Sequence, residues 1–184
     1  MEALDGLHQG ATIGEVLVRL SVALLIGGLV GLERQRMEKP AGLRTHILVA
    51  LGSATFVLLG FEVGSHIAPK YGTQGLDPTR VLQGVVGGIG FLGAGAIIKS
   101  SGHVTGMTTA ASVWIAGALG AAAGLGAYIV AMVATVFTLF TLYVLPRLAT
   151  LVGVPSNSEQ PDASRNPSRA VQGEDEDIPP KPPD

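Results

Sequence analysis

Cysteine is absent from this 184-residue chain, and that absence excludes a disulfide framework, a thiolate metal site and a cysteine nucleophile. Charge is scarce as well: Asp, Glu, Lys and Arg make up 14% of the residues, against roughly 25% in soluble proteins. Residues 100–146 form a run of 47 positions without any of these four residue types. Such a run cannot be the surface of a water-soluble domain, so the composition predicts an integral membrane protein.

Sequence signals for several function classes are also missing. The formal net charge is −2 and the basic residues form no patch interleaved with aromatics, so we expect no nucleic-acid partner. No H-E-x-x-H zinc motif, no pair of intramembrane aspartates and no Ser–His set falls within an apolar segment. We therefore expect a protein that is not an enzyme and that uses no cofactor.

Five apolar segments approach the roughly 20 residues that span a bilayer. The long uncharged run must hold two of them, because a single helix of that length would measure about 70 Å. The expected fold is all-α, a bundle of about five transmembrane helices at residues 13–32, 45–61, 81–98, 104–123 and 127–145. Glu15 and Arg19 open the first helix at the i,i+4 spacing that permits an ion pair.

The predicted membrane domain covers residues 13–147 and lies between two polar ends. Residues 1–12 lack the basic start of a signal peptide, so the first helix is expected to be retained in an extracytoplasmic N-terminal region. Residues 148–184 are expected to form a disordered, Pro-rich, acidic cytoplasmic tail, since seven of the 30 residues from Pro155 onward are proline. Lys and Arg concentrate in the first loop, which predicts that the N-terminus lies outside and the C-terminus in the cytoplasm.

Glycine is abundant in the predicted helices. Residues 88–93 match the dinucleotide fingerprint G-x-G-x-x-G, but the fingerprint needs a preceding strand and a downstream acidic residue, and here it lies inside an apolar span. We interpret the glycines as helix-packing positions, because close backbone contact drives helix association in lipid. The third helix is richest in glycine and is expected at the centre of the bundle. The predicted packing positions are Gly27, Gly31, Gly84, Gly88, Gly90, Gly93, Gly95, Gly120 and Gly124.

Polar side chains gather where predicted helices begin and end. Glu33 and Arg34 close the first helix, and Arg44, Thr45 and His46 open the second, so the two groups are expected to face each other. Two interpretations stay open: functional residues, because buried ionisable groups are costly unless paired, and basic anchors that fix the orientation in the membrane.

Two more polar groups stand at helix starts. Asp77 and Pro78 have the types preferred at an N-cap and first helical position, with Arg80 near enough to pair with Asp77. Thr108 and Thr109 begin the fourth helix, where threonine hydroxyls cap helices or form hydrogen bonds across them. For both groups a structural role and a functional role stay open.

Five blocks of sequence together resemble the membrane domain of the MgtC/SapB family of bacterial inner-membrane proteins, over roughly residues 16–145. The blocks are GLERQ at 31–35, AGLRTH at 41–46, DPTRV at 77–81, GIGFLGAG at 88–95 and GMTTAA at 106–111. Met107 stands where leucine is expected and Gly87 where serine is more usual. The resemblance implies these polar functional positions: Glu33, Arg34, Arg44, Thr45, His46, Asp77, Arg80, Thr108 and Thr109.

The resemblance also implies a function. Members of the family look like regulators of other membrane proteins, linked to adaptation to low magnesium and, in some pathogens, to virulence and survival inside host cells. The implied partners are the lipid bilayer, other membrane proteins such as the proton-driven ATP synthase, and a second copy of the chain. Longer members continue into a soluble ACT-like domain that this chain is expected to lack.

The alternative hypothesis is a small transporter or channel for Mg²⁺ or another ion. A Mg²⁺ path normally offers one or two carboxylates as oxygen ligands. Glu33, Glu62 and Asp77 lie near predicted helix ends and none lies mid-membrane. The sequence therefore favours a regulator that binds other membrane proteins through small-residue helix faces.

Overall fold

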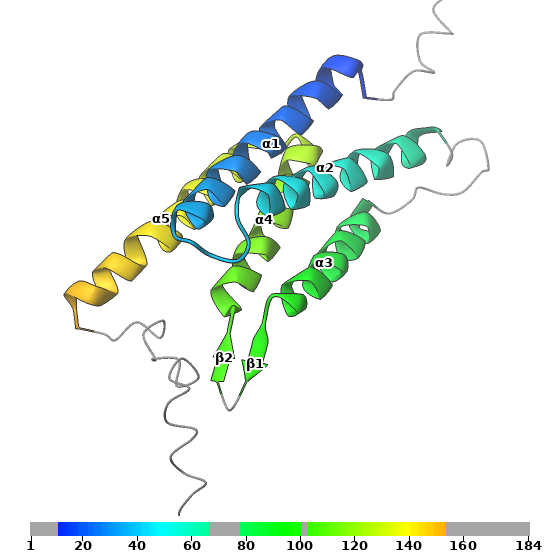
Figure 1. The fold of residues 1–184 in the computed structure, drawn as a ribbon. Helices are drawn as coiled ribbons and strands as arrows, with labels where there is room; N and C mark the ends of the chain where they lie inside the picture. Colours follow the sequence, from blue (N-terminus) through cyan, green and yellow to red (C-terminus); the bar gives the residue numbers. More distant parts are fainter. Residues whose placement is uncertain (1–10, 67–77, 101–102, 154–184) are drawn as a thin grey trace, which may run out of the picture. The chain divides into compact units, whose positions relative to one another are not determined.

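A computed structural model describes residues 11–66, 78–100 and 103–153 of the chain (Figure 1). These residues form five helices and one two-stranded antiparallel hairpin, which confirms the predicted all-α membrane fold. The helices are α1 (Ile13–Arg36), α2 (Leu43–His66), α3 (Pro78–Gly95), α4 (Met107–Leu125) and α5 (Tyr128–Leu151), and the strands are β1 (Ile98–Ser100) and β2 (His103–Thr105). Four of the described helices, α1, α2, α4 and α5, are long and apolar enough to cross a membrane.

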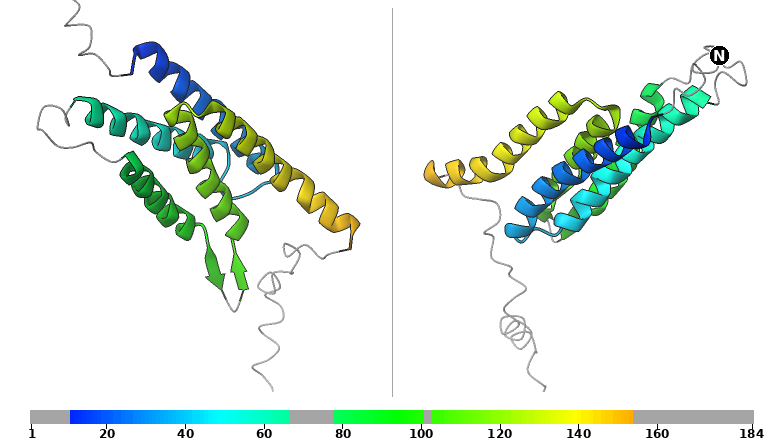
Figure 2. Two further views of the ribbon diagram at one scale, coloured as in Figure 1. Left: turned by 180° about the vertical axis from the view of Figure 1, so that it is seen from behind. Right: turned by 90° about the horizontal axis from the view of Figure 1, so that it is seen from above.

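The centre of the bundle is α4, which contacts α1, α2 and α3 (Figures 1 and 2). Its alanine and glycine residues are buried along most of its length, because small residues let neighbouring backbones approach closely. The prediction that the glycine-rich third helix is central is therefore wrong. Helix α3 packs on α2 and α4 only from one side, and Phe91, on another side, is 82% exposed.

Helix α5 borders the bundle and leaves most of its side chains exposed. Ala131 of α5 joins Ile26 and Val30 of α1 and Leu119 of α4 in one buried cluster. The opposite face is apolar and exposed, with Ile129 at 76% and Phe137 at 67% exposure. An apolar face of this kind suits hydrocarbon and is unusual against water.

Helix α1 begins with a capping box. The Glu15 backbone N–H donates to the Thr12 hydroxyl (3.3 Å), and the Thr12 N–H donates to the Glu15 carboxylate (2.9 Å). Arg19 instead donates from Nη1 to the carbonyl oxygen of Gly124 at the end of α4 (2.9 Å). The i,i+4 partnership expected between Glu15 and Arg19 is thus replaced by a cap within α1 and a bond between helices.

The hairpin between α3 and α4 was not predicted. It occupies the predicted loop between the third and fourth helices together with residue 98 of the predicted third helix and residues 104–105 of the predicted fourth. Gly106 has φ +86°, and a Cβ at that position would collide with the Ala96 carbonyl oxygen. Helix α4 therefore starts only at Met107, after a turn that requires glycine.

The other helices extend beyond their predicted bounds. Helix α1 continues past residue 32 to Arg36, α2 runs from Leu43 to His66, and α5 reaches Leu151, so residues 148–151 of the predicted tail are helical. Hydropathy does not mark these ends, because polar residues at a helix terminus prolong the helix without lengthening its apolar run. Residues 1–10, Asp77 and the tail from 154 onward lie outside the described residues, and so do the predictions made for them.

Candidate functional site

Four glycines hold α1, α2 and α4 at close range and so position the polar site. A Cβ on Gly27 would lie 2.7 Å from the His46 carbonyl oxygen, and one on Gly31 would lie 2.7 Å from the Leu43 Cα. On α4, a Cβ on Gly124 would lie 2.7 Å from the Ala54 carbonyl oxygen, and one on Gly120 would collide with the Ala50 backbone. The start of α2 is therefore pressed against the end of α1.

The first part of the site is a hydrogen-bond chain between α2 and α4. The His46 side chain is fully buried; its Nδ1 lies 2.8 Å from the Gly42 carbonyl oxygen and its Nε2 lies 3.1 Å from the Ser112 hydroxyl. Ser112, 2% exposed, donates in turn to the Thr109 carbonyl oxygen (2.8 Å). A neutral imidazole carries one ring proton. When Nδ1 holds it, Nδ1 donates to the Gly42 carbonyl and Nε2 can accept from the Ser112 hydroxyl; when Nε2 holds it, Nε2 donates to Ser112 while that hydroxyl donates to Thr109.

The second part is a buried ion pair at the end of α1. Glu33 and Arg34 are only 9% and 3% exposed, and Arg34 Nη1 lies 3.8 Å from Glu33 Oε2. Both Glu33 carboxylate oxygens, and Nε and Nη2 of Arg34, have no hydrogen-bond partner among the described residues. A buried pair with unmet hydrogen bonds costs free energy, which makes it a candidate for function and not for stability.

The two parts meet at the junction of α1 and α2. Gly31 precedes Glu33 and Arg34 by two and three residues, and a Cβ at Gly31 would lie 3.0 Å from the His46 Cβ. The site is therefore one internal polar cluster, hereafter the inner cluster, formed by Glu33, Arg34, His46, Thr109 and Ser112.

The remaining predicted positions do not join the inner cluster. Arg44, Thr45, Arg80 and Thr108 are exposed, and Asp77 is outside the described residues. Exposure follows from helix geometry: Arg44 and Thr45 precede His46 and so point to other sides of α2.

Sequence reasoning missed Ser112. The available signal was its spacing, since Ser112 follows Thr109 by three residues and so lies on the same face of a helix. A serine in an otherwise apolar helix is ordinary by itself. Its pairing with His46 requires the two helices to be placed, which only the structure provides.

The inner cluster offers few ligands for a metal. The described residues contain no group of three or more His, Cys, Asp and Glu side chains placed to hold an ion. Both ring nitrogens of His46 are already within hydrogen-bond distance of protein atoms. Glu33, the one carboxylate of the inner cluster, is the ligand that remains. The arrangement is suited to joining three helices and to holding a proton or a water at Glu33 and Arg34.

The predicted packing glycines of α3 behave differently from those of α1 and α4. A Cβ on Gly84, Gly88, Gly90 or Gly95 would have nothing within 4 Å, whereas one on Gly93 would lie 3.6 Å from the Ala110 carbonyl oxygen. Among the described residues, Gly93 is thus the glycine of α3 that lies against α4, and the other glycines of α3 have space for a side chain.

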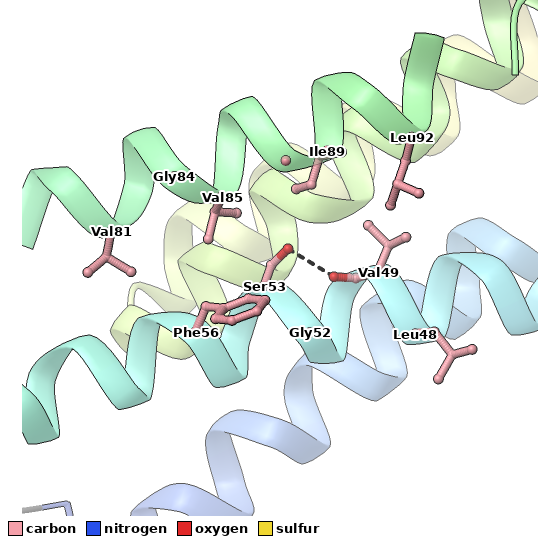
Figure 3. A pocket seen from close by; sticks show the side chains of 11 residues that line it. Leu48, Val49, Gly52, Ser53, Phe56, Val81, Gly84, Val85, Ile89 and Leu92 are labelled. Carbon is pink, nitrogen blue, oxygen red and sulfur yellow. Dashed lines mark hydrogen bonds between the residues drawn. The ribbon is translucent and has the colours of Figure 1, made fainter. Parts of the chain in front are cut away.

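A groove of about 690 Å³ runs between α2 and α3 (Figure 3). Its walls are apolar apart from Ser53, whose hydroxyl donates to the Val49 carbonyl oxygen of its own helix (2.9 Å). Gly84 and Gly88 are among the residues that line it. The groove and the inner cluster are therefore separate features, one facing outward between two helices and one enclosed among three.

Comparison with known proteins identifies relatives of the chain. YhiD of Escherichia coli K12, named as a proposed magnesium transporter, is 41% identical over 62% of this chain and 53% of its own length. SapB of Bacillus subtilis is 40% identical over 62% of this chain and 49% of its own length. MgtC of Brucella abortus is 46% identical over 58% of this chain and 41% of its own length.

The chain spans about half the length of the curated relatives it matches. No solved structure matches it. The model of the MgtC family matches residues 20–151, a range that contains the inner cluster and helices α2 to α5 complete. With most of the sequence covered, the chain belongs to the MgtC family.

Proposed function

We propose that this chain regulates other membrane proteins of a bacterial inner membrane by direct helix contact, in a role linked to adaptation to low magnesium. The observation that carries the proposal is the outward face of α3. Gly87, Gly90 and Ala94 are exposed and follow one side of the helix, and a Cβ on either glycine would have nothing within 4 Å. Small residues on a lipid-facing helix let a foreign helix approach closely.

The distribution of polar groups supports contact over ion passage. The groove between α2 and α3 is apolar, and a hydrated Mg²⁺ ion gives up its water reluctantly. The inner cluster faces the interior, where His46 and Ser112 join α2 to α4. Neither feature offers the series of oxygen ligands that a Mg²⁺ path needs.

The orientation proposed for this role places the end of α1 and the start of α2 in the cytoplasm. Exposed basic residues gather there: Arg36, Lys39 and Arg44. Positive charge favours the cytoplasmic side of the membrane. If α3 crosses the membrane together with the four longer apolar helices, the C-terminus is cytoplasmic as well.

A photo-crosslinking side chain at Ala94, in cells, tests the contact. We expect a covalent adduct with a specific membrane protein, and the proton-driven ATP synthase is the first partner to examine. Gly90→Leu should abolish the adduct, because the larger side chain fills the outward face of α3. Gly88→Leu, which points into the groove, is the matched control and should preserve it. An adduct that survives Gly90→Leu contradicts the proposal.

The physiological half of the proposal needs a separate measurement. A strain without the gene should grow less well at low magnesium, with altered membrane potential or cellular ATP. The wild-type gene should restore growth, and the Gly90→Leu variant should not. Equal growth of the deleted and complemented strains at low magnesium would remove the physiological role.

Ion transport is the second candidate, and a specific observation favours it. Glu33 is a buried carboxylate, and neither of its oxygens has a hydrogen-bond partner among the described residues. The relative YhiD is named as a proposed magnesium transporter. Purified protein in proteoliposomes should then carry Mg²⁺ or proton flux that Glu33→Gln abolishes. Flux at the level of empty liposomes would discard this candidate.

A further inference from the structure

The groove between α2 and α3 has one closed end and one open end. At the closed end α2 touches α3, since a Cβ on Gly60 would lie 2.5 Å from the Val81 Cγ2. At the other end Leu48 of α2 and Leu92 of α3 line the groove and remain 68% and 54% exposed. The groove is therefore closed at Gly60 and Val81 and exposed at Leu48 and Leu92, which lie on the side of the start of α2, away from Val81 (Figure 3).

The occupant must be apolar along most of its length. A space of about 690 Å³ lies within the range of about 300–1,000 Å³ typical of ligand sites. Ser53 is the one polar side chain of the lining, and its hydroxyl already donates to its own helix. Water in such a space would find too few partners, so hydrocarbon is the filling that the lining favours.

The walls favour a flexible chain over a second helix. On the α3 side, Gly84 and Gly88 leave the backbone open, but the α2 side presents Leu48 and Phe56, which are 68% and 62% exposed. Close helix packing in lipid uses small residues on the faces that meet. A hydrocarbon chain can instead bend around the two bulky side chains and fill the glycine side.

Charge at the open end indicates the headgroup. Arg44 lies one helical turn before Leu48, on the same face of α2. Lys99 lies in the hairpin that follows α3 at this end of the bundle (Figure 1). Both residues are exposed, and exposed basic residues at the membrane surface attract anionic lipids.

We propose that the groove between α2 and α3 binds one anionic phospholipid, with an acyl chain between Gly84, Gly88, Leu48 and Phe56 and the headgroup phosphate at Arg44. The lipid occupies the groove face of α3, whereas the proposed contact with other membrane proteins uses its outward face at Gly87 and Gly90. The two proposals are independent, because the lipid assay needs no partner protein.

The test measures lipid retained by the purified full chain. The protein is exchanged into nanodiscs that contain equal amounts of phosphatidylglycerol and phosphatidylcholine, then extracted, and its bound lipid is counted by native mass spectrometry. We expect about one retained phosphatidylglycerol per chain, in preference to phosphatidylcholine. Retention of neither lipid, or of both equally, overturns the proposal.

Three variants locate the lipid. Gly88→Leu fills the groove and should remove the retained lipid, while Gly87→Leu, its neighbour on another side of α3, is the matched control and should keep it. Arg44→Gln should lower the preference for phosphatidylglycerol about fivefold, the ratio expected when one basic residue is lost at an anionic surface. Retention that is equal in Gly88→Leu and Gly87→Leu, or a preference unchanged by Arg44→Gln, contradicts the assignment.

A second measurement separates lipid from a helix as the occupant. Phe56→Cys or Leu92→Cys, in a chain that otherwise has no cysteine, allows disulfide cross-linking between copies. We expect no cross-linked dimer from either position when lipid fills the groove. An efficient dimer that also excludes phosphatidylglycerol would show that a second copy, and not a lipid, occupies the space.

Discussion

The Nε2 atom of His46 lies 3.1 Å from the hydroxyl oxygen of Ser112, and this contact joins α2 to α4 in the interior of the bundle. Neither side chain reaches the surface, with 0% and 2% exposure. A hydrogen bond between two transmembrane helices contributes modestly, about 0.6 kcal/mol on average. Its larger effect arises when one partner is removed and the other is left buried without a bond.

Ser112→Ala should therefore destabilise the protein by about 1–3 kcal/mol, because it leaves Nε2 of His46 without a partner. Ser53→Ala is the matched control: Ser53 is also buried, at 4%, but its hydroxyl donates to the Val49 carbonyl oxygen within its own helix. The free energy of unfolding in mixed micelles measures both. If the two alanine variants lose equal stability, the bond between α2 and α4 is not what Ser112 contributes.

The turn before α4 depends on Gly106. Gly106→Ala places a Cβ against the Ala96 carbonyl at a φ of +86°, and a non-glycine residue in that conformation costs roughly 1–3 kcal/mol before the collision is counted. Gly14→Ala, in the exposed first turn of α1 with nothing within 4 Å, should be neutral or slightly stabilising. The unfolding temperature in detergent compares the two variants. If Gly106→Ala unfolds at the wild-type temperature, the hairpin turn is free to rearrange.

Much of this architecture was predictable from composition and hydropathy. The five helices and the glycine contacts of α1 with α2 could be anticipated because apolar runs and small-residue pairs are local patterns. The hairpin could not be anticipated, since Ile98, Val104 and Thr105 look like the ends of two apolar helices and the residues between them look like an ordinary loop. It depends instead on the fit between Gly106 and Ala96, which are ten positions apart.

The candidate site was predictable only in part, for a similar reason. Glu33, Arg34 and His46 were identified because ionisable residues are rare in apolar sequence. The distinction between buried His46 and its exposed neighbours Arg44 and Thr45 required the helix face to be known. The central position of α4 also depends on which small residues actually meet another backbone, a property of pairs of helices and not of glycine content.

Gly120 should tolerate substitution far less well than Gly84. A Cβ on Gly120 would collide with the Ala50 backbone, whereas one on Gly84 would meet nothing within 4 Å. Gly120→Ala should therefore force α2 and α4 apart and lower the free energy of unfolding by about 1–3 kcal/mol. Gly84→Ala should raise it by up to about 1 kcal/mol through helix propensity. Equal effects on unfolding in mixed micelles would show that the α2–α4 contact is not tight.

The ion pair of the inner cluster provides the last prediction. Glu33→Leu leaves the Arg34 guanidinium, 3% exposed, without its carboxylate, and breaking a buried pair in this way costs about 3–5 kcal/mol. The double variant Glu33→Leu/Arg34→Leu removes both charges, and with them the four atoms of the pair that have no hydrogen-bond partner in the described part of the chain. It should recover most of the lost stability or exceed the wild type, because apolar residues of similar size often replace a buried pair at no cost.

The free energies of unfolding of the wild type, both single variants and the double variant together give the coupling energy between Glu33 and Arg34. A double variant that restores stability but fails to restore growth at low magnesium would assign the pair to function, whereas a double variant less stable than either single one would show that the charges hold the bundle together.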